Sequence, residues 1–237
     1  ARLAQGLIDA GLGHNSKVGM YLYNSPEYAE TNFAAMKISG VPINVNYRYL
    51  DDELHYLLEN ADIEALVFHS SLGDRVARVC DRLPMLKAMI CVDDGPAEDG
   101  SMGPATGIPY DTFLSQASGA AKTNPQGDEI YMLYTGGTTG MPKGVMYPLD
   151  AFTEFFMRGF PPMIGLPPFE DAAQFGPAAR QMVDANSTVV AMSGPPLMHG
   201  TGCWLGLMFP HMLGGTSVLL ENRGFKPEEV WLSLIHI

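Results

Sequence analysis

The chain has 237 residues, of which 46% are hydrophobic and 17% charged, so it can bury a large core as one big domain or two smaller ones. Its formal net charge of −12 argues against nonspecific binding to nucleic acid, although one local cationic loop can still bind a nucleotide. Three cysteines without a C-x-x-C pair indicate neither a disulfide framework nor a zinc site, which favours a cytoplasmic setting. The sequence contains no apolar run long enough to span a membrane.

The first half of the chain alternates between strand and helix patterns, which predicts an α/β architecture with layers of helices on a sheet. A helix is predicted at the start, where Leu3 and Leu7 share one face. The next predicted elements are strands at 17–23, 41–45, 65–69 and 88–92, and helices at 26–39, from about 52 and at 72–83. We expect Ser25 to cap the second helix, Gly40 to end it, and Asp51 or Asp52 to cap the third.

The second half contains loops between shorter predicted elements. Residues 93–108 are rich in Gly, Pro and Asp and are expected to form a surface loop. The elements predicted after it are a strand at 130–134, a helix at 150–158, a short helix at about 172–184 within a Pro-rich excursion, strands at 187–193 and 216–220, a helix ending near 213, and a last helix from 225. Gly214 and Gly215 are expected to form a turn.

A glycine- and threonine-rich segment directly follows the predicted strand 130–134. Residues 134–145 read YTGGTTGMPKGV. Glycine allows several backbone N–H groups to point toward one anion, while threonine hydroxyls add donors and lysine adds a positive charge. The segment therefore predicts a phosphate-binding loop, for which the plainer alternative is a surface turn. The candidate phosphate-binding residues are Thr135, Gly136, Gly137, Thr138, Thr139, Gly140 and Lys143.

The loop differs from the two commonest nucleotide-binding motifs. The Walker pattern requires Gly-Lys-Ser/Thr, whereas Met141 and Pro142 separate Gly140 from Lys143, and no G-x-G-x-x-G is present. The order T-G-G-T-T-G-x-P-K-G resembles the signature of the adenylate-forming, or AMP-binding, synthetases, in which Ser is common at the position of Gly137. This resemblance implies that Lys143 and Thr139 are catalytic, and that the substrates and cofactors are ATP, Mg²⁺ and coenzyme A.

A second segment, Pro196-Leu-Met-His-Gly-Thr-Gly202, is similar to the motif that borders the acyl pocket in these synthetases. The resemblance implies that Met198, His199, Gly200 and Trp204 contact the carboxylic acid substrate. The alternative for His199 is a buried, hydrogen-bonded histidine of the core. A third segment, Asn44-Val-Asn46-Tyr-Arg48, also matches, and we expect its asparagines to tie down a loop and Arg48 to pair with a carboxylate.

The motifs together look most similar to bacterial fatty-acyl-CoA synthetases, including those acting on bulky or steroid-derived acids. The resemblance implies that residues 1–231 are an incomplete N-terminal AMP-binding domain, with one α/β part at about 1–125 and a second, including the phosphate loop, at about 126–231. The C-terminal domain and the metal-binding glutamate are expected outside this sequence, so no metal ligand is assigned within it. Residues 232–237 are expected to be a non-native tail, because they resemble a translated sequencing adapter.

Two other function classes remain open at this point. One is a different adenylating enzyme, either amino-acid-activating or luciferase-like. The other is a nucleotide-binding protein that has lost catalysis.

Overall fold

The computed structural model describes residues 1–95, 106–137, 140–220, 223 and 226–234. The chain divides into two compact units, Ala1–Tyr147 and Pro148–Ile237, which are described separately below as the first and second units. We expected a division near residue 125, before the phosphate loop. In the structure the division follows that loop, because the strand leading into it, β6 (Ile130–Gly137), packs against β2 (Val41–Asn44) of the first unit.

The first unit is built on a five-stranded parallel sheet with the strand order β2-β1-β3-β4-β5. Besides β2, its strands are β1 (Lys17–Tyr21), β3 (Ile63–His69), β4 (Ala88–Val92) and β5 (Ile108–Pro109). Parallel sheets are covered by helices on both faces, so their central strands are apolar along their whole length. The side chains of Val18, Leu66 and Phe68 are accordingly fully buried.

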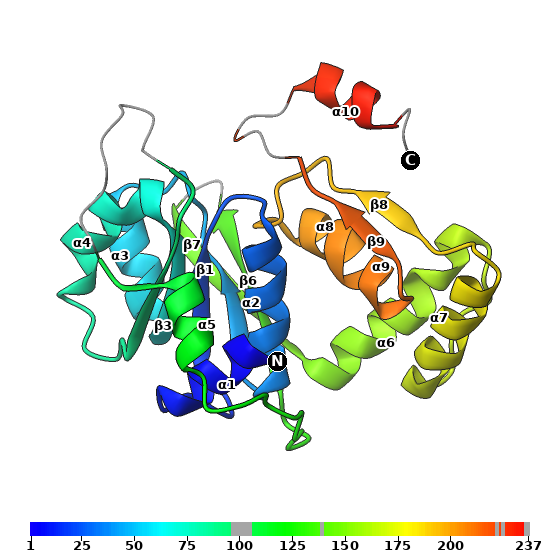
Figure 1. Cartoon of the computed structure of the whole chain (residues 1–237), viewed down its shortest axis with the longest axis horizontal. Helices are drawn as coiled ribbons and strands as arrows, with labels where there is room; N and C mark the ends of the chain where they lie inside the picture. Colours follow the sequence, from blue (N-terminus) through cyan, green and yellow to red (C-terminus); the bar gives the residue numbers. More distant parts are fainter. Residues whose placement is uncertain (96–105, 138–139, 221–222, 224–225, 235–237) are drawn as a thin grey trace. The chain divides into compact units, whose positions relative to one another are not determined.

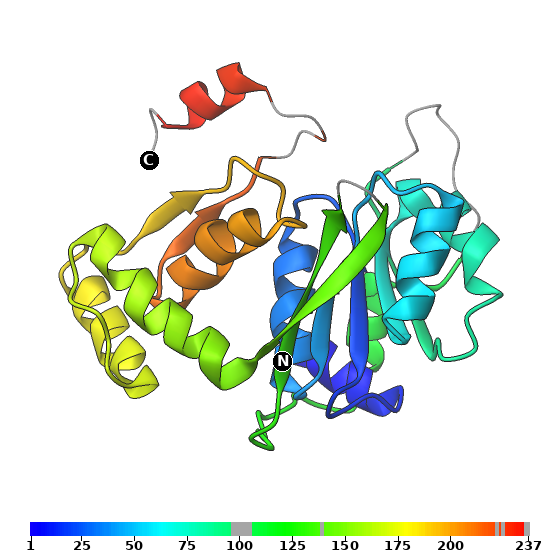
Figure 2. The same cartoon turned by 180° about the vertical axis from the view of Figure 1, so that it is seen from behind.

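Helices form two layers on this sheet (Figures 1 and 2). Helix α1 (Arg2–Asp9) packs against both α2 (Pro26–Lys37) and α5 (Tyr110–Gln116), and α3 (Asp51–Asn60) packs against α4 (Gly73–Cys80). A short 3-10 turn, η1 (Ser70–Leu72), leads into α4. The predicted α/β class with layered helices is confirmed.

The ends of α2 illustrate one correct and one wrong prediction. Ser25 caps the helix as expected, because its hydroxyl oxygen accepts a hydrogen bond from the Tyr28 N–H at 3.3 Å. The left-handed residue after the helix is Ser39, with φ of 55°, and not Gly40. Glycine is needed at position 40 for space, since a Cβ there would lie 2.8 Å from the carbonyl oxygen of Ser16.

The cap expected for α3 was also wrong. The helix begins at Asp51, so the residue before it, Leu50, occupies the N-cap position and contributes no side-chain cap. The Glu53 carboxylate instead accepts the N–H of Leu50 at 3.1 Å. Three acidic residues in the first turn still favour the positive end of the helix dipole.

Two strands that border the phosphate loop form a separate two-stranded sheet within the first unit. Strand β6 continues three residues past Tyr134, where the predicted strand ended, and β7 (Gly140–Pro148) follows it. Neither β7 nor β5 and α5 was predicted; in β7, Gly, Pro and Lys match loop patterns better than strand patterns. Part of the predicted surface loop, residues 96–105, lies outside the described residues.

The second unit contains more helix than strand. Its two strands, β8 (Val190–Met192) and β9 (Thr216–Val218), pair in parallel, with Val190 opposite Thr216. The helices and turns are α6 (Leu149–Gly159), η2 (Pro161–Ile164), η3 (Ala172–Gln174), α7 (Phe175–Asp184), α8 (Gly200–Cys203), η4 (Trp204–Met208), α9 (Phe209–Met212) and α10 (Pro227–Leu234). The predicted Gly214–Gly215 turn is present, and Gly214 has a positive φ of 67°.

Three of these elements form one continuous helical segment, residues 200–212. Its middle part, η4, is a π-helix, in which the Phe209 N–H bonds to the Trp204 carbonyl five residues earlier.

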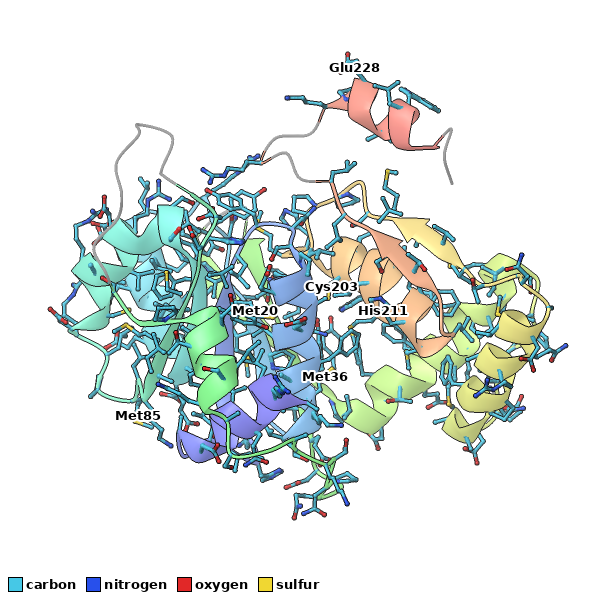
Figure 3. All side chains as sticks on the ribbon, viewed as in Figure 1. Met20, Met36, Met85, Cys203, His211 and Glu228 are labelled. Carbon is cyan, nitrogen blue, oxygen red and sulfur yellow. The ribbon has the colours of Figure 1, made fainter. Side chains whose placement is uncertain are left out.

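The methionines are scattered and differ in burial: Met20 is buried in the sheet, whereas Met85 is 50% exposed (Figure 3). Among the described residues, no helix combines the length and apolarity that crossing a membrane requires.

Candidate functional site

The candidate phosphate loop connects the exposed ends of β6 and β7. Thr135 and Gly136 are exposed at the end of β6, and Gly140 is exposed at the start of β7. A Cβ built at Gly136 or Gly140 would meet no atom within 4 Å, so these glycines border open space. The backbone next to this space can therefore approach a ligand closely. Thr138 and Thr139 lie outside the described residues, and Gly137 is the last residue of β6.

Lys143 lies on β7, three residues after Gly140, and is exposed. In the part of the chain that the structure describes, no carboxylate forms an ion pair with its ammonium group. The neighbouring Pro142 is buried, and its ring fixes the backbone φ angle of β7 directly before Lys143. The structure thus places an exposed cation and exposed glycines on the neighbouring strands β6 and β7.

The strand leading into the loop is held by Asn44, the first of the two asparagines predicted to be structural. Its side chain makes two hydrogen bonds to the backbone of Tyr134, at 2.8 and 2.7 Å. Asn46 makes a local turn, because its Oδ1 accepts the N–H of Arg48 at 2.9 Å. Both asparagines therefore tie down backbone, as expected.

The predicted pairing of Arg48 with a carboxylate is not seen among the described residues. Arg48 is exposed, and no described carboxylate lies within ion-pair distance of it. The guanidinium that stabilises this segment is that of Arg75 on α4, whose Nη1 donates to the carbonyl oxygens of Tyr47 at 3.1 Å and Tyr49 at 3.3 Å. Sequence spacing could not identify Arg75, since it lies 26 to 28 positions away from its acceptors.

The candidate acyl-binding residues lie around the start of the helical segment 200–212 in the second unit. His199 is the N-cap residue of α8 and is exposed, which does not fit the alternative of a buried core histidine. Gly200 is the first helical residue and is partly exposed. Met198 is only 4% exposed, so its side chain belongs to the packed interior of this unit.

Trp204 is half-buried and is surrounded by aromatic rings of α6. Its ring meets those of Phe152 and Phe155 edge-on, with centroids 5.4 and 6.0 Å apart. Phe155 is 49% exposed, so the rings of Trp204 and Phe155 form a partly open apolar surface. Neither phenylalanine was among the predicted site residues, although their spacing on a predicted helix places them on one face.

Glycines allow the helical segment to approach the preceding chain closely. A Cβ at Gly202 would lie 2.3 Å from the carbonyl oxygen of Pro196, and one at Gly206 would lie 2.4 Å from the Cβ of Ser193. The Ser193 hydroxyl donates to the carbonyl oxygens of Pro195 at 2.6 Å and Gly202 at 3.3 Å. The π-helix is thus packed directly against the segment that precedes His199.

The described residues contain no group of three or more His, Cys, Asp or Glu side chains that could hold a metal ion. No residue of these ranges is therefore assigned to a metal. The candidate phosphate loop lies in the first unit, and the candidate acyl-binding residues lie in the second.

The chain resembles known proteins over nearly its whole length. A family model described as AMP-binding enzyme matches residues 1–236. The medium/long-chain-fatty-acid–CoA/3-oxocholest-4-en-26-oate–CoA ligase of Mycolicibacterium smegmatis is 35% identical over 237 residues, covering 98% of this chain and 41% of the relative. The 3-oxocholest-4-en-26-oate–CoA ligase of Rhodococcus rhodochrous is 35% identical over 231 residues, covering 97% and 40%.

Solved structures show the same fold. An acyl-CoA synthetase of Brucella canis superposes with a TM-score of 0.70 at 18% identity, over 100% of this chain and 38% of that one. ATP-bound MatB of Rhodopseudomonas palustris superposes with a TM-score of 0.67 at 21% identity, over 99% and 40%. This chain spans about two fifths of the length of the relatives it matches. From the match over nearly its whole length, the chain belongs to the AMP-binding enzyme family.

Proposed function

We propose that the protein containing this chain activates a carboxylic acid with ATP and transfers the acyl group to coenzyme A. The carboxylate oxygen attacks the α-phosphorus of ATP, the bond from that phosphorus to the bridging oxygen breaks, and pyrophosphate leaves with the bonding electrons. The thiol of coenzyme A then gives up its proton and attacks the acyl carbon, and AMP leaves. The ligase names of the relatives support this reaction class.

In this proposal the loop between β6 and β7 binds the phosphates that leave as pyrophosphate. The observation that carries it is the exposed Lys143 on a hairpin whose glycines border open space. Backbone N–H groups of residues 135–140 and the Lys143 ammonium would stabilise negative charge as it builds on the leaving group. Thr139 would add a hydroxyl donor, in keeping with its assigned catalytic role. Magnesium would neutralise further phosphate charge, and no residue of this chain is assigned to hold it.

The proposed substrate is a medium- or long-chain fatty acid or a steroid-derived acid. Two relatives carry the name of a steroid acid, and the half-open aromatic surface of Trp204 and Phe155 suits a large apolar group. His199 and Gly200 would border the carboxylate end, where the first N–H groups of the helical segment are available to an anion. Met198 would support this region from within.

We further propose that these 237 residues alone do not complete the reaction. The family resemblance assigns a metal-binding glutamate, a ribose-binding aspartate and a catalytic lysine to segments that this sequence does not contain. The chain would then supply the pyrophosphate-binding loop and part of the acyl pocket of a cytoplasmic enzyme.

The test is acid-dependent ATP–pyrophosphate exchange by the complete gene product. Lys143→Ala is expected to slow exchange by roughly a hundredfold, because losing one donor to a developing oxyanion costs about two to four kcal/mol. Lys122→Ala, which removes another exposed charge from a different part of the first unit, is the control and should leave exchange unchanged. Equal exchange in both variants would contradict the assigned role of Lys143.

Testing different acids in the same assay distinguishes the proposed enzyme from the alternative function classes. Exchange stimulated by fatty acids or by 3-oxocholest-4-en-26-oate supports the proposal. Stimulation by amino acids alone would indicate an amino-acid-activating enzyme, whereas oxidation of the adenylate with light emission would indicate a luciferase-like enzyme. Binding of ATP without exchange for any acid would indicate a protein that has lost catalysis.

A further inference from the structure

Asn44 joins the first unit's main sheet to the strand that leads into the phosphate loop. It is the last residue of β2, and its side chain is only 8% exposed. Its Nδ2 donates to the carbonyl oxygen of Tyr134 at 2.8 Å, and its Oδ1 accepts the N–H of the same residue at 2.7 Å. These are the two bonds that a residue of a neighbouring strand would make, so one amide takes the place of a strand pairing.

Tyr134 is held at two further points. Its hydroxyl donates to Oδ1 of Asn60, the last residue of α3, at 2.8 Å. Its ring lies against the backbone of β7, since a Cβ at Gly144 would be 2.9 Å from the Tyr134 ring. Burial raises the pKa of the Tyr134 phenol to about 12, so the hydroxyl remains a donor near neutral pH.

These contacts reach both ends of the candidate phosphate loop. Tyr134 directly precedes Thr135, and Gly144 directly follows Lys143. The direction of N–H groups in a glycine-rich loop depends on the strands that anchor it, because glycine itself restricts the backbone little. A fixed anchor lowers the cost of ordering the loop around an anion.

We propose that Asn44 is a positioning residue for the phosphate-binding loop: its amide fixes the backbone of Tyr134, and through Tyr134 it fixes the loop around pyrophosphate. This inference rests on the proposed function of the loop. Asn44 itself does not contact the ligand. Its loss is therefore expected to weaken pyrophosphate binding without abolishing the fold.

The experiment measures binding of inorganic pyrophosphate to the 237-residue chain by titration calorimetry. Asn44→Ala is expected to raise the Kd by about tenfold, the size typical of losing a group that orients a binding residue. Asn46→Ala is the matched control, because Asn46 lies two positions away and its side chain accepts the N–H of Arg48 within its own turn. Its Kd should equal that of the original chain.

A second control separates positioning from general loss of stability. Ile43→Val removes one methylene from the core beside Asn44 and leaves the amide intact. It is expected to lower the Tm and leave the Kd unchanged. If Ile43→Val weakens pyrophosphate binding as much as Asn44→Ala does, Asn44 acts only through stability and the inference is wrong.

The pH dependence of Asn44→Asp provides a readout that a packing role would not move. The introduced carboxylate can accept the N–H of Tyr134 but repels its carbonyl oxygen, whereas the protonated carboxyl can donate to that oxygen. Burial raises the pKa of such a group. The ratio of the variant's Kd to that of the original chain should fall from about tenfold near pH 8 toward about twofold near pH 5. A constant ratio would contradict the inference.

Lys143→Ala distinguishes failure of this inference from failure of the proposed function. If the original chain binds pyrophosphate, Lys143→Ala weakens binding and Asn44→Ala does not, only the positioning role is wrong. If the original chain does not bind, or Lys143→Ala has no effect, the loop's function is wrong and the inference that rests on it is wrong too.

Discussion

Single side chains decide how the strands around the phosphate loop are held. The Asn44 amide takes the place of a strand pairing. The Glu129 carboxylate likewise holds backbone N–H groups one residue before β6. The Glu129 carboxylate accepts the N–H of Gly127 at 3.0 Å and the hydroxyl of Ser39 at 2.9 Å, and it also accepts the N–H of Gln126. Bonds to the ionised form, that of Gln126 above all, lower its pKa to about 2.

This depressed pKa predicts a contribution to stability that depends on pH. A carboxyl whose folded pKa lies below its unfolded value stabilises the fold above the unfolded pKa, and the stabilisation disappears as pH falls through the folded pKa. The Tm of the original chain should therefore exceed that of Glu129→Gln above about pH 5, and the difference should vanish as pH approaches about 2. Thermal unfolding followed by circular dichroism across this range measures it.

Glu228→Gln is the control for this effect. Glu228 is exposed on α10 (Figure 3), so its replacement should leave the Tm curve of the original chain unchanged. A Tm difference for Glu129→Gln that does not change with pH would contradict the assigned hydrogen bonds.

At the scale of elements, the helical segment 200–212 is defined by close contacts at glycine. Gly202 and Gly206 lie four residues apart, and neither position has room for a Cβ against the chain at 193–196. Helices can approach a neighbouring backbone closely only where small residues face it. The glycines therefore set the distance between this segment and the residues that lead to His199.

Adding a methyl group at these glycines should separate the packed elements. Gly202→Ala is expected to lower the free energy of unfolding by about 1–3 kcal/mol, since its Cβ would meet backbone atoms that cannot rotate away. Gly176→Ala in α7, where a Cβ meets no atom within 4 Å, is the matched control and should raise stability by about 0.4–1 kcal/mol. Urea unfolding measures both, and equal effects would contradict the packing argument.

At the scale of the whole molecule, most of the architecture could be predicted from the sequence, because apolar periodicity reports burial directly. Strand β4 was predicted with its observed bounds, Ala88–Val92, and the α/β layers followed from the alternation of patterns. Strand β7 could not be predicted, since its Gly, Pro and Lys residues are typical of loops and weaken the strand pattern. The contacts of Arg75 and Phe155 depend on packing between distant segments, which local patterns do not encode.

The two units are expected to respond differently to denaturant. Both tryptophans, Trp204 and Trp231, belong to the second unit, so tryptophan fluorescence reports on that unit alone. In its described residues the second unit has two three-residue strands that are not buried, whereas strands β2, β1 and β3 of the first unit's sheet are almost entirely buried. The fluorescence midpoint in urea should therefore be lower than the circular dichroism midpoint.

The Trp204→Phe variant tests which tryptophan carries this signal. Trp231 is 69% exposed and should change little on unfolding, so the early fluorescence transition should disappear in the variant. Coincident midpoints for the two probes in the original chain would mean that both units unfold as one.

The π-turn Trp204–Met208 has a consequence for how chain length can vary. A π-turn holds one residue more than an α-turn between bonded groups, so deleting one residue within it would restore regular α-helix while both ends of the segment stay in place. A length change of one residue, which elsewhere would shift a whole helix, would here exchange the ring that faces Phe152 for a neighbouring side chain. Length variation at this turn would thus change the aromatic surface that we propose to contact the acyl group.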